Sequence, residues 1–163
     1  MKKKVSLSQQ PLKKLRRLFV DPASGSSGWA LFDGSDFVQS GTVAVNKREH
    51  VSQRLAKVFW EYRELDLQFD EVHVEDVPRS RTCHIYVHYS IGVILAALAP
   101  KATVQKVDIP VKAWQKHVDW DRENRDSPAA CAEERLQICK GAASRDEQAA
   151  VGMGLWFLAQ ETP

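Results

Sequence analysis

Residues 15–32 read LRRLFVDPASGSSGWALF, and this stretch determines how the rest of the chain is interpreted. An apolar run from Leu18 to Val20 ends in the carboxylate of Asp21, and a second apolar run begins at Trp29. The residues between them are Pro, Ala, Ser and Gly, which predicts two adjacent strands joined as a hairpin. The first run is apolar at successive positions, which is typical of a strand covered on both faces.

Asp21 is expected at the end of this buried strand, where a carboxylate is costly unless something pairs with it. A divalent cation is one candidate for that partner. The alternative is an Asp that caps the turn through its own side-chain hydrogen bonds. This stretch alone favours neither interpretation.

The length of 163 residues fits one domain with a sizeable core. No run approaches the roughly 18 apolar residues of a membrane span, and no apolar segment follows the basic N-terminus as in a secretory signal. The three cysteines, Cys83, Cys131 and Cys139, form no CxxC pair. We therefore expect a cytoplasmic protein with no disulfide framework, zinc site or membrane partner. Its small size is compatible with a bacterial or a viral source.

Charge is distributed unevenly along the chain. Residues 1–17 contain seven Lys and Arg and no acid, whereas the remainder has 16 basic against 21 acidic residues. We predict a basic disordered arm over residues 1–14 and one domain over residues 15–163. Such an arm suits a polyanion such as nucleic acid, and the alternative is a solubilising tail.

Hydrophobic periodicity predicts the order of strands and helices in this domain. Strands are expected at residues 15–21, 29–33, 37–45, 69–77 and 102–107. Helices are expected at residues 48–67, 81–98, 111–118, 127–139 and 144–160, with Ser144 as the N-cap of the last. The first three strands would be antiparallel and the next two parallel, so the fold class is α/β. A five-stranded mixed sheet with helices on both faces is expected.

The helix predicted at residues 81–98 is apolar nearly all round in its second half (IGVILAAL). One sheet face covers only one side of such a helix, so a second partner is required. That partner is either a second copy of the chain, in a two-fold homodimer, or a later helix.

Three acids occupy comparable places in the predicted fold. Asp21 ends the first strand, Glu75 lies near the end of the fourth, and Asp146 opens the last helix. Acidic oxygens that converge in this way are the ligands Mg²⁺ requires. Two such ions, about 4 Å apart, can hold the attacking water and the leaving oxygen in phosphodiester hydrolysis.

Five segments in order carry a family resemblance: residues 21–30 (DPASGSSGWA), 74–77 (VEDV), 81–98, 109–112 (IPVK) and 146–153 (DEQAAVGM). Together they resemble the motifs of the RuvC-type Holliday junction resolvases, in the RNase H-like (retroviral integrase) superfamily. The resemblance covers roughly residues 15–158. It identifies segment 81–98 with the helix that forms much of the family's dimer interface.

The resemblance implies an Mg²⁺-dependent crossover junction endodeoxyribonuclease, with Mn²⁺ as an alternative ion, that acts in DNA recombination, repair or replication. Its catalytic metal ligands would be Asp21, Glu75 and Asp146, with Asp21 bridging two ions. Its partners would be branched DNA, as a four-way junction, and a second copy of the chain.

Basic side chains near these motifs are candidate DNA contacts. The resemblance assigns Lys112 to a segment that carries a DNA-contacting lysine, and Lys116 shares its predicted helix face. Arg79 and Arg81 follow the second motif and are expected to contact phosphates. The alternative for the lysines is a solvated helix face.

The chain departs from the family at Ala149, where the last motif normally has a second aspartate. Glu147 is not expected to substitute, because it points about 100° away from its neighbour on the helix. This leaves two other functions open: a non-catalytic junction-binding protein on the same fold, and another RNase H-like nuclease. His73, two residues before Glu75, is interpreted as a packed core histidine, and the alternative is a group that supports the metal ligands. Trp114 is interpreted as a packed residue, and the alternative is stacking on DNA bases.

Overall fold

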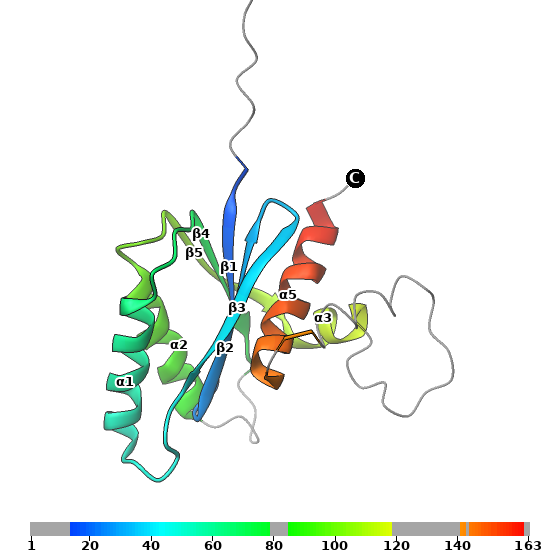
Figure 1. The fold of residues 1–163 in the computed structure, drawn as a ribbon. Coiled ribbons are helices and arrows are strands. Elements are labelled where there is room, and N and C mark those ends of the chain that lie inside the picture. Colours follow the sequence, from blue (N-terminus) through cyan, green and yellow to red (C-terminus); the bar gives the residue numbers. More distant parts are fainter. Residues whose placement is uncertain (1–13, 79–84, 119–140, 143, 162–163) are drawn as a thin grey trace, which may run out of the picture.

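The computed structural model describes residues 14–78, 85–118, 141–142 and 144–161 (Figure 1). The strands are β1 (Arg16–Asp21), β2 (Ser26–Asp33), β3 (Asp36–Ala44), β4 (Glu71–Asp76) and β5 (Val104–Pro110). The helices are α1 (Val51–Glu64), α2 (Ile85–Leu98), α3 (Val111–His117) and α5 (Arg145–Glu161). None of the helices in the described ranges is long and apolar enough to cross a membrane.

The five strands form one mixed sheet in the order β3-β2-β1-β4-β5. The first three strands pair antiparallel, and β4 and β5 continue the sheet in parallel with β1. This arrangement confirms the predicted α/β architecture. Leu18, Phe19 and Val20 are fully buried, as expected for a central strand covered on both faces.

Successive side chains of β1 point to opposite faces of the sheet, so the core has two layers. Leu18 and Val20 pack on one face of the sheet in the cluster that includes residues of α1 and α2. Phe19 packs on the opposite face, in a cluster with Trp114 and Met153. Figure 1 shows α1 and α2 on one side of the sheet and α5 on the other.

Two strands are longer than predicted. β2 begins at Ser26 rather than at residue 29, because Ser26 to Gly28 pair with the end of β3. β5 runs on to Pro110 after a shift of register between Val74 and Glu75 of β4. The helix predicted at residues 127–139 lies outside the described residues, as does most of the predicted basic arm. Lys14, at the end of that arm, forms an ion pair with Asp36 at 2.8 Å.

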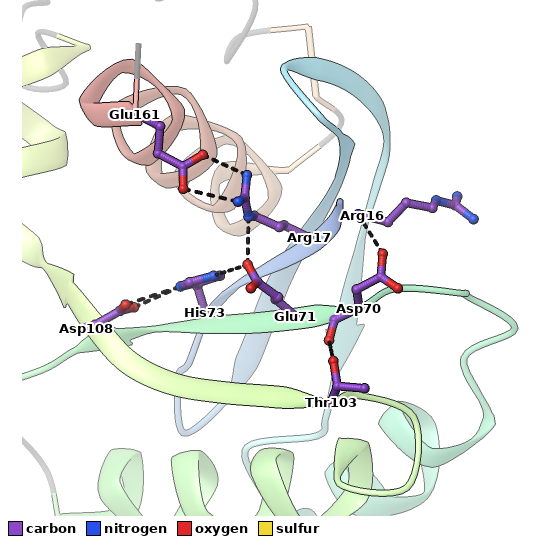
Figure 2. A network of polar contacts seen from close by, with 8 residues as sticks. All are labelled: Arg16, Arg17, Asp70, Glu71, His73, Thr103, Asp108 and Glu161. Atoms are coloured by element: carbon purple, nitrogen blue, oxygen red, sulfur yellow. Dashed lines mark hydrogen bonds and ion pairs between the residues drawn. The ribbon is translucent and has the colours of Figure 1, made fainter. Parts of the chain in front are cut away.

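A network of charged groups joins β1, β4 and the end of α5 (Figure 2). The Arg17 side chain donates to Glu71 at 2.7 Å and to Glu161 at 3.1 Å. His73 lies between Asp108, 3.1 Å from its Nδ1, and Glu71, 3.4 Å from its Nε2. Because Arg17 and His73 are both buried, these partners are needed to offset their loss of hydration.

His73 is also packed between two aromatic rings. Its ring centroid lies 5.4 Å from that of Phe19 and 4.2 Å from that of Phe157. It is therefore a core histidine, as the sequence suggested.

Candidate active site

The register of the sheet places Asp21 beside Glu75. Val20 pairs with Val74 in the parallel ladder of β1 and β4, and the two carboxylates are the next residues on these strands. Because Val20 and Val74 point into the α1–α2 layer, Asp21 and Glu75 point to the face that α5 covers. Two residues that are 54 positions apart in the chain thus become neighbours.

Asp146 reaches this place through a close approach between α5 and β2. Gly28 lies opposite Asp21 in the antiparallel ladder. A Cβ atom on Gly28 would lie 1.9 Å from the backbone oxygen of Asp146, so only glycine leaves room for the helix here. The Ser26 hydroxyl donates a hydrogen bond to the Asp146 carboxylate. The start of α5 is therefore held against the strand that pairs with β1.

The adjacent Glu147 anchors the same helix end to β3. Its buried carboxylate accepts hydrogen bonds from Thr42 at 3.0 Å and Ser40 at 3.1 Å. Its backbone N–H donates to the Ser144 hydroxyl at 3.1 Å, which confirms the predicted N-cap. Glu147 thus contacts the edge strand, whereas Asp146 lies beside Asp21.

The three predicted acids line one pocket of about 160 Å³. Asp21, Glu75 and Asp146 are contributed by β1, β4 and α5, respectively. The other lining residues are Val111, Trp114, Gln115, Arg145 and Ala149. Ala149 therefore lies at the same site as the three acids, at the position where the resemblance expects a further aspartate.

Burial and crowding of like charges perturb the two strand carboxylates. Burial raises the pKa of Asp21 well above its usual range, and the nearby charges of Glu75 and Asp146 raise it further. Burial also raises the pKa of Glu75, while hydrogen bonds from Trp114 and Asp21 act in the opposite direction. The two strand carboxyls are therefore close enough to oppose each other's ionisation, and burial disfavours the charged form of both.

This donor set fits a hard divalent cation by its chemistry. All three acids offer carboxylate oxygens, which Mg²⁺ and Mn²⁺ prefer over nitrogen or sulfur ligands. A cation would also offset the mutual repulsion that raises the pKa of Asp21. Within the described ranges, no three Asp, Glu, His or Cys side chains are arranged to hold one ion as they stand. Ligation by all three acids would therefore require side-chain rotation.

Trp114 makes a contact with this site that its sequence position did not indicate. The residue packs in the core, as expected, and is only 2% exposed. Its indole Nε1 also donates to Oε1 of Glu75 at 2.6 Å. The direction of an indole N–H depends on how α3 packs against the sheet, and periodicity carries no information about it.

The candidate DNA-contacting residues are only partly described. Lys112 and Lys116 are both exposed on α3, the helix whose Val111, Trp114 and Gln115 line the pocket. Their solvent exposure fits both a phosphate contact and a solvated helix face. Arg79 and Arg81 lie outside the described residues.

Comparison with known proteins identifies the fold. No family model and no curated protein matches the chain. The structure is similar to Thermus thermophilus RuvC, with a TM-score of 0.63 and 15% identity over 90% of this chain and 96% of that one. It is also similar to T. thermophilus RuvC in complex with a Holliday junction substrate, with a TM-score of 0.66 and 14% identity over 91% and 96%. The chain therefore has a RuvC-like, RNase H-like fold, as the sequence motifs predicted.

Proposed function

We propose that this protein is a metal-dependent endonuclease that cleaves four-way DNA junctions. The observation that carries the proposal is the convergence of Asp21, Glu75 and Asp146 in one pocket on a RuvC-like fold. One similar structure, of T. thermophilus RuvC, contains a Holliday junction substrate. A nuclease of this kind would act in DNA recombination, repair or replication.

Asp21, Glu75 and Asp146 would bind Mg²⁺, with Mn²⁺ as a substitute. The bound ions would supply Lewis-acid stabilisation of the charge that develops on the phosphate. A bound cation would lower the raised pKa of Asp21, because a nearby positive charge favours the ionised form. Ser26 and Trp114 would hold the other two carboxylates through the hydrogen bonds already described.

A homodimer fits both the substrate and the surface of α2. α1 packs beside α2 and covers one of its sides. Ile85, Tyr89, Gly92 and Ala96 are exposed at helical spacing along another side. A Cβ atom on Gly92 would meet nothing within 4 Å, so a second helix could approach closely there. A symmetric dimer through this stripe would present two pockets to the two opposed strands of one junction.

Lys112 and Lys116 would contact phosphates beside the pocket, and Arg79 and Arg81 would add contacts from the segment after β4. The basic arm at residues 1–14 would contribute further affinity that is independent of sequence and falls as salt rises. Together these residues would orient a negatively charged strand across the pocket without reading its bases.

A non-catalytic junction-binding protein is the second candidate, because Ala149 gives the pocket one carboxylate fewer than the family motif supplies. The deciding experiment is a cleavage panel of a four-way junction, a flap and an RNA–DNA hybrid, each with Mg²⁺ and with Mn²⁺. We expect paired nicks in the junction. Binding without product would favour the second candidate, and preferential cutting of the hybrid would point to another RNase H-like nuclease.

A further inference from the structure

We infer that Trp114 is a positioning residue that orients the Glu75 carboxylate for metal binding, and that Gly152 holds the indole in place. This inference rests on the proposed metal site at Asp21, Glu75 and Asp146. It concerns two residues that are not themselves oxygen ligands, one on α3 and one on α5.

The contact between Trp114 and Glu75 is short and shielded from water. Nε1 of the indole lies 2.6 Å from Oε1 of the carboxylate, and the two residues are 2% and 6% exposed. An indole N–H can only donate, so the bond favours the ionised, metal-binding form of Glu75. Hydrogen bonds to a charged group are roughly twice as strong as those between neutral groups. The bond therefore fixes one carboxylate oxygen and with it the direction of the whole group.

The opposite edge of the indole is held by a helix that has no side chain at the contact point. A Cβ atom on Gly152 would lie 3.0 Å from Cε3 and 3.1 Å from Cζ3 of Trp114. These atoms belong to the benzene part of the indole, away from Nε1. The ring thus lies between α5 and the Glu75 carboxylate, and a Cβ at position 152 would crowd the edge of the ring that faces away from Glu75.

Orientation of Glu75 matters more here because the pocket contains Ala149 in place of a fourth acid. With three carboxylates, the loss of one well-directed oxygen removes a larger share of the available ligands. Outer-shell partners of metal ligands typically contribute about 10–100-fold in metal affinity. We expect the hydrogen bond from Trp114 to contribute to metal affinity within this range.

The test is direct Mn²⁺ binding, measured by electron paramagnetic resonance of the free ion in the absence of DNA. Trp114→Phe keeps an aromatic ring and removes the N–H donor, and we expect Mn²⁺ binding to weaken by about 10–100-fold. Gly152→Ala keeps the donor and crowds the far edge of the ring, and we expect a smaller loss in the same direction. Alanine favours a helix interior over glycine, so helix propensity cannot explain that loss.

Trp156→Phe is the matched control for the loss of an indole, because Trp156 lies on α5, as Gly152 does, and does not line the pocket. Its Mn²⁺ binding should equal that of the wild type. Equal binding by Trp114→Phe and the wild type would overturn the inference and leave the proposed nuclease intact. If Trp114→Phe does not fold, Gly152→Ala decides, and unchanged binding there overturns the inference. A wild type that binds no Mn²⁺ at millimolar concentration would overturn the proposed function as well.

Discussion

Asp21 and Glu75 lie side by side on two parallel strands, one step beyond the paired residues Val20 and Val74, and both line the same pocket. Two acids in such a contact must share a proton or a cation, because both cannot be ionised and unpaired in a buried site. The register of β1 and β4 therefore creates the pair of carboxylates on which the proposed metal site depends. It also makes the stability of the protein sensitive to pH and to divalent ions.

Asp21→Asn should stabilise the protein at pH 8 in the absence of divalent ions. Because the pKa of Asp21 is raised, the contribution of this one carboxyl to stability is greatest below its ordinary pKa and is lost as pH rises through the folded-state pKa. Asn does not ionise, so the variant should lack this fall. The melting temperature of Asp21→Asn at pH 8 should therefore be higher than that of the wild type.

Thermal unfolding from pH 5 to 9, with and without Mg²⁺, measures both effects. Mg²⁺ should raise the melting temperature of the wild type more than that of Asp21→Asn. Asp36→Asn is the control, since Asp36 is exposed and pairs with Lys14 outside the pocket. If the melting temperatures of the wild type and Asp21→Asn change with pH in parallel, ionisation of Asp21 does not reduce the stability of the protein.

Ala149→Asp should tighten metal binding by adding a fourth carboxylate to the pocket. In the absence of metal the new buried charge should lower the unfolding free energy by about 1–3 kcal/mol. Mg²⁺ should then stabilise this variant more than the wild type, and junction cleavage should increase. Calorimetric titration with Mn²⁺ provides the measurement, with Ala149→Asn as the uncharged control of nearly the same size. Equal responses of the two variants would mean that residue 149 does not face the metal site.

Gly28→Ala should displace Asp146, because its Cβ would lie 1.9 Å from a backbone oxygen that no side-chain rotation can move. We expect a loss of about 1–3 kcal/mol in stability and of about 100-fold in cleavage. Gly25→Ala is the matched control, since its nearest contacts are with the flexible Lys47 side chain. Urea unfolding measures the loss of stability, and single-turnover cleavage measures the loss of activity. Similar behaviour of both variants would contradict the close packing of α5 on β2.

Tyr89→Glu should shift the protein from dimer to monomer. Tyr89 lies in the exposed stripe of α2 and is 49% exposed, so the substitution should not unfold a single chain. Burial of a carboxylate in an apolar interface without a partner should abolish association. Sedimentation at micromolar concentration tests this, with Trp60→Glu on α1 as the control for loss of an exposed aromatic residue. A monomeric wild type would refute the proposed interface.

Glu71→Gln should reduce the stability of the protein at pH 7. The variant should also lose less stability than the wild type as pH falls. Burial acts to raise the pKa of Glu71, but hydrogen bonds from Arg17 and His73 outweigh it and hold the pKa below its usual 4.5. The contribution of Glu71 is therefore complete above pH 4.5 and is lost as pH falls through the folded-state pKa.

We expect Glu71→Gln to cost about 1–3 kcal/mol at pH 7, since it weakens the charged hydrogen bond to Arg17. Glu161→Gln should cost less than about 1 kcal/mol, because Glu161 is more exposed. Urea unfolding between pH 3 and 7 gives both values. Equal costs for the two variants would show that burial does not strengthen the Glu71 pair.

Local pattern predicted the parts of the fold that depend on burial and periodicity. The successive apolar residues of β1 indicated a central strand, helical spacing located α1, and the capping pattern at Ser144 located α5. The convergence of Asp21, Glu75 and Asp146 followed because the ends of β1 and β4 meet at one edge of a parallel pair. Ser144 was recognisable as a cap from its spacing to Glu147.

Features that depend on tertiary packing were not predictable. Ser26 to Gly28 have a loop composition, and they become strand only because they pair with β3. The hydrogen bond from Trp114 to Glu75 depends on where α3 lies relative to the sheet. The burial of Glu147 against β3 likewise has no local signature, since an acid in the first helical turn is normally exposed.

The most direct test of the metal nuclease is cleavage of a synthetic four-way junction by the wild type and Asp21→Asn, with binding measured in parallel. In Mg²⁺ the wild type should produce paired nicks in opposed strands, and a chelator should stop the reaction. Asp21→Asn should bind the junction with similar affinity and yield no product. Cleavage retained by Asp21→Asn, or a wild type that binds the junction and never cuts it, would contradict a catalytic role for this pocket.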